Sequence, residues 1–373
     1  MTITLKHVFK HVFVDGLENY RNDKPVVLAC NHPNSFLDGI MFDVVLPKPL
    51  YILTRGDSMN SKFKRSIFSK LNIVPIHRLS EGKENLIKND ETFIKCREIL
   101  KDKGTVIIFS EGLCVQEKRM RPLKKGTARI CLEFIKNYPE MDLHVIPTGI
   151  NVDEFNTPKS NINLNIGKSL DLTSVSKTYI ENPAKGILEF NALLAPKIKE
   201  RIIHLDTVEN EMLFNQTYLP QFRTNFLNTF IFNTSLINDK IEVANQLNQG
   251  ISPVVNSQYQ VDFRKHYLFF GLVKSLLFVF KIFFFLPNSL TNYIVNNKVS
   301  NPVFKHSVFV GLKMILGTLN CLILIIIALL AFGWEWAILS ILVIYIMLQI
   351  TPYMHNYLLN YSTFKKGKNK YSI

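Results

Sequence analysis

Cysteine is scarce in this sequence, and the few cysteines present are not arranged as metal ligands or disulfide pairs. Five cysteines are spread over 373 residues, at positions 30, 96, 114, 131 and 321. Zinc sites and disulfide frameworks show close, repeated spacings, which this set lacks. We therefore expect no metal site and no disulfide framework, with reduced thiols in a cytosolic setting.

Two loops that carry chemistry in other enzymes are also missing. No Gly-x-Ser-x-Gly nucleophile elbow occurs, so the sequence does not indicate an acyl-enzyme on an activated serine. Gly167-Lys168-Ser169 lacks the upstream glycine that a phosphate-binding loop requires. Any acyl or phosphate chemistry must then use other residues.

Acidic residues are the minority, with 30 Asp and Glu against 44 Lys and Arg, for a net charge of +14. Such a surface suits nucleic acid, anionic lipid headgroups or a phosphorylated substrate. The charges are concentrated in residues 1–265, whereas residues 267–355 contain long runs rich in Phe, Ile and Leu. These runs favour a lipid bilayer as the partner, and we expect no nucleic acid.

Two of the apolar runs have the length of membrane spans. Residues 312–332 and 337–355 are separated by Gly-Trp-Glu-Trp, which predicts a helical hairpin over 311–355. Lysines precede the first run and follow the second, so both outer ends should be cytoplasmic. The run 267–286 carries Lys274 and Lys281 on one helical face, which indicates an interfacial helix, with a third full span as the alternative.

The N-terminus has no signal-peptide pattern. Instead, apolar residues recur at helical spacing beside Lys6 and Lys10; they are Leu5, Val8, Phe9, Val12 and Phe13. This spacing predicts an amphipathic helix, either at a membrane interface or packed on the domain.

Strand-like apolar runs alternate with amphipathic stretches through the first half of the chain. The runs lie at 25–29, 50–54, 72–78, 105–109 and 143–147, with a weaker one at 163–170. Helical patterns lie near 37 and at 62–71, 83–101, 124–138 and 184–250. The alternation predicts an α/β fold with a mostly parallel sheet flanked by helices, followed by a C-terminal helical membrane segment.

We accordingly divide the chain into five parts. They are an amphipathic N-terminal helix at 1–20, an α/β domain at 21–180, a helical extension at 181–265, a hydrophobic membrane segment at 266–356 and a basic cytoplasmic tail at 357–373.

Residues 29–38 read Ala-Cys-Asn-His-Pro-Asn-Ser-Phe-Leu-Asp, which places a histidine at a strand end and a carboxylate one helical turn later. Pro33 keeps His32 extended, and the two polar residues that follow can cap the next helix. Asp38 then falls in the first turn, where the helix dipole favours its charge. A histidine held by a carboxylate is a competent general base for a substrate hydroxyl, with a simple capping pair as the alternative.

Asn31-His32 followed by Asp38 resembles motif I of the PlsC-type glycerolipid acyltransferases. The family usually has four residues between its His and Asp, whereas this chain has five. That spacing resembles the branch of fungal-type glycerol-3-phosphate and dihydroxyacetone-phosphate acyltransferases. The resemblance implies that His32 and Asp38 are the catalytic residues.

Arg78 resembles the arginine of motif II, which binds the acceptor's phosphate in this family. Residues 109–112, Phe-Ser-Glu-Gly, resemble motif III, where Glu111 and Gly112 would contact the acceptor. Ser110 and Leu113 stand where the family commonly has Pro and Thr or Ser.

Two further stretches complete the resemblance. Residues 118–127 resemble the link to a lysine-glycine helix start, so Lys125 is a candidate phosphate-binding residue. Residues 145–149, Val-Ile-Pro-Thr-Gly, resemble motif IV, in which Pro147 would shape the acyl-binding pocket.

The resemblance implies a membrane-bound acyltransferase on the cytoplasmic face of the cytoplasmic membrane. It would move an acyl group from acyl-CoA or acyl-ACP to glycerol-3-phosphate or dihydroxyacetone phosphate in phospholipid biosynthesis, with no cofactor. The alternatives are transfer to 1-acylglycerol-3-phosphate (lysophosphatidate), transfer to an aminoacyl lipid, and a non-catalytic lipid-binding protein that kept the fold.

Overall fold

The computed structural model describes residues 9–55, 70, 72–76, 88–155, 160–219, 231–232, 237–253 and 267–370. The strands are β1 (Phe9–Asp15), β2 (Val26–Cys30), β3 (Leu50–Arg55), β4 (Ile73–Ile76), β5 (Thr105–Phe109), β6 (His144–Val152), β7 (Ser160–Ile166) and β8 (Ile231–Phe232). The expected helix at 62–71, apart from residue 70, and Arg78 lie outside the described residues.

The helices fall into three groups along the chain. Those next to the strands are η1 (Leu17–Asn19), α2 (Phe36–Val45), α5 (Lys88–Lys101), α6 (Lys125–Asn137), α7 (Thr173–Glu181) and α8 (Pro183–Lys199). A small middle group contains α9 (Val208–Leu213), η4 (Phe214–Tyr218) and α10 (Ile237–Asn248). The last group contains α11 (Tyr267–Phe283), α12 (Phe285–Lys298), α13 (Pro302–Phe332) and α14 (Trp334–Lys370).

The strands form one eight-stranded sheet in the order β4-β3-β5-β2-β6-β7-β1-β8. All neighbouring strands pair in parallel except β6 and β7, so the predicted mostly parallel α/β fold is confirmed. Cys30 at the end of β2 lies in register with Phe109 of β5 and Thr148 of β6. The carboxyl end of β2 therefore lies in the middle of the sheet edge where open α/β sheets bind ligands.

Successive side chains of the central strand β2 enter two different cores. Val27 and Ala29 pack with residues of α5, α6, α7 and α8 on one face, and Val26, Leu28 and Cys30 pack with α2 on the other. This alternation follows from the two-residue period of a strand. Since both faces are covered, a central strand is apolar throughout, which is why the runs at 25–29 and 105–109 were recognisable.

The expected N-terminal helix is wrong for the described residues. Phe9–Asp15 is strand β1, which pairs in parallel with β7 and β8, and only Leu17–Asn19 forms a short 3-10 turn. The apolar residues that fit a helical period also suit a nearly continuous buried strand, and the valines and phenylalanines of this stretch favour strand structure. Sheet pairing with residues 160–166, far away in sequence, decides between the two.

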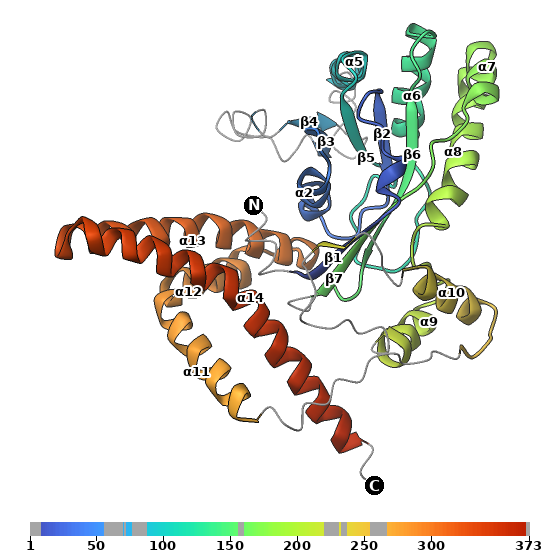
Figure 1. The fold of residues 1–373 in the computed structure, drawn as a ribbon. Coiled ribbons are helices and arrows are strands. Elements are labelled where there is room, and N and C mark those ends of the chain that lie inside the picture. Colours follow the sequence, from blue (N-terminus) through green and yellow to red (C-terminus); the bar gives the residue numbers. More distant parts are fainter. Residues whose placement is uncertain are drawn as a thin grey trace.

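The C-terminal helices form a group that projects from the α/β domain (Figure 1). Val303–Phe332 and Trp334–Thr351 are each long and apolar enough to cross a membrane, and Gly333 turns the chain between them. Gly271–Phe283 and Phe285–Lys298 form a bent pair with an angle of 75°, the geometry of a broken span or a re-entrant loop. Residues 357–370, expected as a basic tail, continue α14 as helix.

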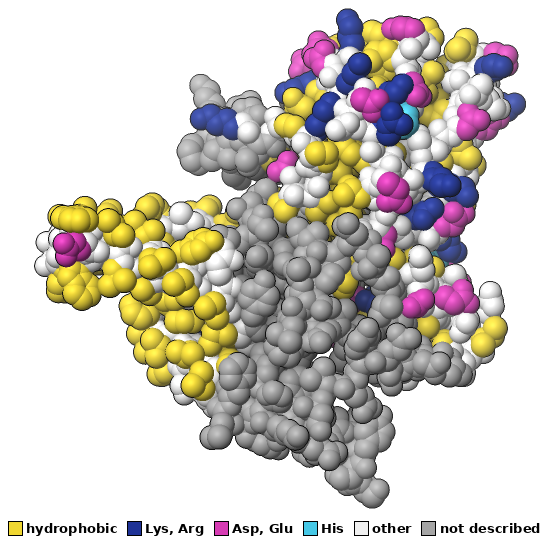
Figure 2. Space-filling view, viewed as in Figure 1, with side chains coloured by type: hydrophobic (Ala, Val, Ile, Leu, Met, Phe, Trp, Pro, Cys, Tyr) yellow, Lys and Arg dark blue, Asp and Glu magenta, His cyan; other side chains and the backbone are white. Residues whose placement is uncertain are grey.

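The surface of this helical group differs from that of the α/β domain. In the view of Figure 2, hydrophobic side chains cover its described part, whereas Lys, Arg, Asp and Glu gather over the α/β domain. Large exposed apolar patches on a protein mark contact with a membrane or a partner. On the face shown in Figure 2, charged side chains are therefore concentrated over the α/β domain and the helical group is largely apolar.

The first part of α13 packs on the α/β domain. Val310 is fully buried in the core that contains α2, and Met314 packs against the same core. The ring of His306 lies edge-on to Phe9 of β1, with 6.3 Å between ring centroids. From Ile315 onwards, where 61% of that residue is exposed, much of the helix surface is apolar and uncovered. Helix α13 thus connects the sheet to the apolar hairpin.

Candidate active site

His32 and Asp38 meet as their spacing predicts. His32 follows the end of β2, and Asp38 lies in the first turn of α2. The Nδ1 atom of His32 lies 2.9 Å from Oδ2 of Asp38, and the backbone N–H of Asn34 donates to the same oxygen at 2.9 Å. Since Nδ1 faces the carboxylate, Nε2 lies on the opposite side of the imidazole ring. This is the orientation that a general base requires.

The surroundings of the pair differ for its two members. Asp38 is fully buried, and burial raises the pKa of its carboxyl group, while the hydrogen bonds with His32 and Asn34 oppose that shift. The side chain of His32 is 16% exposed and stacks on Phe109, with ring centroids 3.8 Å apart and an interplanar angle of 13°. The imidazole is therefore held at one face and at its Nδ1 edge, and a small part of the side chain remains exposed.

Asn31 fixes the strand end that carries His32. Its side-chain amide donates to the carbonyl of Ile150 at 2.9 Å, and its Oδ1 accepts from the N–H of Ile150 at 2.7 Å. This two-point contact with β6 satisfies backbone groups just where the regular pairing of β2 ends. The asparagine before the histidine thus has a structural task that its place in the motif alone did not reveal.

Glu111 lies just after β5, beside the strand that leads to His32. Its side chain is buried, and burial raises its pKa from 4.5 to about 7. The N–H of Arg121 donates to its Oε1 at 3.2 Å and opposes the shift, while the nearby charge of Asp38 raises the pKa further. Gly112 adopts a φ of +66°, which favours glycine, and turns the chain away from the strand.

The other predicted site residues lie in different settings. Lys125 is exposed at the start of α6. Pro147 is buried within β6, in register with Ala29, and its carbonyl accepts from Gly167. The structure therefore brings His32, Asp38 and Glu111 to one edge of the sheet, while Pro147 lies deeper in it. Arg78 lies outside the described residues, so its relation to His32 is not placed.

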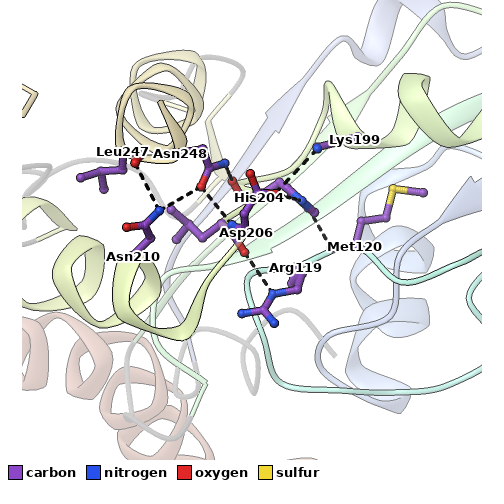
Figure 3. A network of polar contacts seen from close by, with 9 residues as sticks. Arg119, Met120, Lys199, His204, Asp206, Asn210, Leu247 and Asn248 are labelled. Atoms are coloured by element: carbon purple, nitrogen blue, oxygen red, sulfur yellow. Dashed lines mark hydrogen bonds and ion pairs between the residues drawn. The ribbon is translucent and has the colours of Figure 1, made fainter. Parts of the chain in front are cut away.

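The connection from β5 to α6, residues 110–124, is called the β5–α6 loop here. Figure 3 shows part of the network that holds it: Arg119 donates to the carbonyl of Leu205 at 3.1 Å, and the N–H of Met120 donates to Nδ1 of His204 at 3.0 Å. Asn248 of α10 donates in turn to the carbonyl of His204. Residues that follow α8 thus fix the loop that contains Glu111.

A buried charge cluster holds the same loop from another side. Lys118 donates to the backbone carbonyl of Asp153 at 2.7 Å, and Lys240 of α10 pairs with the carboxylate of Asp153 at 2.6 Å. Burial lowers the pKa of Lys118 to about 8. Asp153, just after β6, and polar residues of the segment after α8, which showed no recognisable motif, therefore form a scaffold for the β5–α6 loop.

The turn between β2 and α2, residues 31–35, is called the β2–α2 turn here. It makes two contacts with the β5–α6 loop: the N–H of Ser35 donates to Sγ of Cys114, and the N–H of Val115 donates to the carbonyl of His32. Cys114 and Phe109 were not among the predicted site residues. The sequence signals that could have identified them are the place of Phe109 as the first residue of motif III and the nearness of Cys114 to that motif.

The described residues contain no group of three or more His, Cys, Asp or Glu side chains that could hold a metal ion. What the described residues offer is a carboxylate-held imidazole beside a buried glutamate. Such an arrangement can remove a proton from a substrate hydroxyl.

Residues 11–151 match the family model described as Acyltransferase. The matched segment contains the His32–Asp38 pair, Glu111, Lys125 and Pro147, and it ends within β6. The chain is also similar to a solved structure, the 1-acyl-sn-glycerophosphate (LPA) acyltransferase PlsC from Thermotoga maritima. Identity is 18%, coverage is 51% of this chain and 79% of that chain, and the TM-score is 0.35. No curated protein sequence matches.

Proposed function

We propose that this protein is a membrane-bound glycerolipid acyltransferase, which moves an acyl group from a thioester to a hydroxyl of a phosphorylated acceptor. The observation that carries the proposal is the His32–Asp38 contact at the carboxyl end of β2, inside the segment that matches the Acyltransferase model. The resemblance of the surrounding motifs to glycerolipid acyltransferases supports the acceptor class.

The reaction needs one base and no covalent enzyme intermediate. Nε2 of His32 removes the proton from the acceptor hydroxyl as its oxygen attacks the thioester carbonyl. The new ester C–O bond forms, the C–S bond breaks, and the thiolate of CoA or acyl carrier protein leaves with the proton that His32 returns. Asp38 stabilises the imidazolium that exists between the two proton transfers. Stacking on Phe109 keeps the ring in place throughout.

The acceptor that we favour is glycerol-3-phosphate, with dihydroxyacetone phosphate in the same class. Arg78 and Lys125 would bind the phosphate, since a guanidinium fork matches phosphate oxygens. Glu111 would accept a hydrogen bond from an acceptor hydroxyl, and Gly112 lets the backbone turn beside it. Pro147 would form part of the apolar wall for the acyl chain. Five residues rather than four between His32 and Asp38 support this choice of acceptor.

Helices α13 and α14 would form a membrane hairpin with both outer ends on the cytoplasmic side. Gly333 and the first turn of α14 contain no cation, and that turn includes Trp334 and Trp336, which suit the far interface. The bent pair α11 and α12 would lie at the cytoplasmic interface, where its lysines can reach the headgroups. The active site would then face the cytoplasm, where a water-soluble donor meets a lipid product.

The function is tested with purified full-length protein and a panel of acceptors. Radiolabelled acyl-CoA and acyl-ACP are each offered with glycerol-3-phosphate, dihydroxyacetone phosphate, lysophosphatidate and an aminoacyl lipid. We expect labelled product with glycerol-3-phosphate and none from a His32→Ala variant. Labelled phosphatidate only would move the assignment to lysophosphatidate. If no acceptor consumes the thioester, the protein is a lipid-binding relative and the proposal fails.

Topology is tested by cysteine-accessibility labelling in cells. Single cysteines are placed at Gln260, Asn296 and Asn360, in a background from which the two partly exposed native cysteines, Cys114 and Cys321, have been removed. Labels at all three positions should report the cytoplasmic side. Opposite sides for positions 260 and 296 would show that the bent pair crosses the membrane, and would contradict the interfacial arrangement.

A further inference from the structure

The β2–α2 turn contains a strained residue beside the catalytic pair. Ser35 has φ 58° and ψ −142°, a combination that is essentially restricted to glycine. Its hydroxyl makes no capping hydrogen bond to α2, so the usual reason for a serine at this position is missing. A conformation of this kind persists only where the surrounding structure holds it.

Two contacts hold the peptide group that joins Asn34 to Ser35. Its carbonyl oxygen accepts a hydrogen bond from Oγ of Ser307 at 3.1 Å, and its N–H donates to Sγ of Cys114 at 3.1 Å. Ser307 lies on α13, is fully buried and is 273 residues away in sequence. One of the two restraints on this peptide group therefore comes from the helix that leads into the apolar hairpin.

The β2–α2 turn is connected to His32 through one oxygen atom, Oδ2 of Asp38. The N–H of Asn34 donates to Oδ2 of Asp38, which is the atom that contacts Nδ1 of His32. Among the described residues, Oδ1 of Asp38 has no hydrogen-bond partner. A rotation of the turn would therefore shift the one oxygen that orients the imidazole.

The packing of α13 on the α/β domain fixes the position of Ser307. One turn after Ser307, Val310 is fully buried in the core that contains α2. His306, directly before Ser307, packs against Phe9. Ser307 is thus fixed on a helix that touches the same core as the helix carrying Asp38. The exposed apolar surface of α13 begins only after this docked part.

We propose that Ser307 is a positioning residue for acyl transfer: it holds the strained peptide group between Asn34 and Ser35, and so makes the geometry of the His32–Asp38 pair depend on the seating of α13. This proposal rests on the proposed function. It gives α13 two tasks, since its first turns orient the catalytic turn and its remainder enters the membrane. Release of α13 from the domain lowers turnover without any change in the acceptor site.

Ser307→Ala removes the hydrogen bond and little volume. In full-length protein, kcat should fall about two- to tenfold, the factor expected for one neutral hydrogen bond, while the acceptor KM stays unchanged. The matched control is Thr318→Ala on the same helix, because within the part of the chain that the structure describes the Thr318 hydroxyl donates to the carbonyl of Met314 on its own helix and to no other group. That control should retain the wild-type kcat. A wild-type kcat for Ser307→Ala would overturn the proposal.

A double-mutant cycle separates positioning from general destabilisation. Ser35→Gly allows the turn to adopt its conformation without strain, so Ser307→Ala should cost much less in the Ser35→Gly background than in the wild type. An equal loss in both backgrounds would show that Ser307 only stabilises the fold, and would overturn the proposal.

Hydrogen exchange tests the same contact without an activity assay. Backbone amides in the peptide covering residues 33–45 should exchange faster in Ser307→Ala than in wild type or Thr318→Ala. If the wild-type protein transfers no acyl group, the proposed function fails, and faster exchange still demonstrates the restraint. Unchanged exchange in that peptide would contradict the restraint whatever the activity.

Discussion

The β2–α2 turn and the β5–α6 loop both follow central strands of the sheet, but they are held in different ways. In the turn, the two hydrogen bonds to Oδ2 of Asp38, from His32 and from the N–H of Asn34, connect residues no more than six positions apart. Distant residues contact this turn at its backbone carbonyls, the N–H of Ser35 and the side chain of Asn31. In the loop, Arg119, Met120 and Lys118 depend on Leu205, His204 and Asp153. The comparison shows that the contact between His32 and Asp38 is largely a local product of sequence, whereas the loop that carries Glu111 is held mainly by tertiary contacts.

Apart from the loss of His32 itself, the largest expected effect on activity is that of Asp38→Asn, in the first turn of α2. It should lower kcat by about 100-fold, because the amide cannot stabilise the imidazolium. The loss should still be smaller than for His32→Ala. Steady-state kinetics with saturating donor measures it, and the thermal midpoint checks that the variant folds. A silent Asp38→Asn would show that the two residues do not act as a pair.

For the contacts that hold the β5–α6 loop, the largest effect of a substitution should be on the stability of the protein. Asp153→Ala leaves Lys240 without its buried carboxylate partner, so the free energy of unfolding should fall by about 3 kcal/mol. A denaturant titration monitored by far-ultraviolet circular dichroism measures the loss. Lys185→Ala is the control, since its pair with Glu189 is exposed and should contribute less than about 1 kcal/mol. Equal effects of the two substitutions would contradict the scaffold role.

A substitution at Glu111 should change both the activity and the pH dependence of stability. Because burial raises its pKa from 4.5 to about 7, the folded protein holds more protons than the unfolded chain between these values. Stability from this group is therefore complete below about pH 4.5 and is lost as pH rises to about 7.

Glu111→Gln keeps an oxygen that can accept from Arg121 but does not titrate. Relative to wild type, it should be stabilised at pH 8 by on the order of 3 kcal/mol and little changed at pH 4.5. Its acceptor KM should rise. If the melting temperatures of the two proteins depended on pH in the same way across this range, the raised pKa of the buried Glu111 carboxyl group would be contradicted.

The smallest effect is expected at His204. Burial and the nearby charge of Lys199 lower its pKa, and Asp206 opposes the shift. The folded protein then binds fewer protons than the unfolded chain below pH 6.5, so stability is complete above that pH and falls as the solution is acidified. His204→Asn retains an acceptor for the Met120 N–H and should flatten the pH dependence of the thermal midpoint between pH 7 and 5. An unchanged slope would contradict this.

The same division explains how much could be predicted from the sequence. The bounds of β5, Thr105–Phe109, coincide with the predicted strand, because a continuous apolar run between a glycine and polar residues has few alternatives. The helical interpretation of residues 9–15 failed because their spacing fits two periods and the pairing with β7 is not visible in one sequence. The contact between His32 and Asp38 was predictable, since both residues belong to one strand-to-helix connection.

Contacts across long sequence distances were not predictable. The stacking of Phe109 on His32 joins the end of β5 to the β2–α2 turn, and the Ser307 contact joins that turn to a residue 273 positions away on α13. Neither residue type carries a pattern that indicates such a partner. The acyltransferase resemblance indicates candidate catalytic residues, but it does not include the residues that hold them in place.

The central claim is that His32 is the base of an acyl transfer. The most direct measurement is release of free thiol from acyl-CoA by the purified full-length protein, with and without glycerol-3-phosphate, for wild type and His32→Ala. The account predicts acceptor-dependent thiol release by wild type and a loss of about 10²- to 10⁴-fold in His32→Ala, with an unchanged thermal midpoint. Equal acceptor-dependent release by the two folded proteins would contradict it.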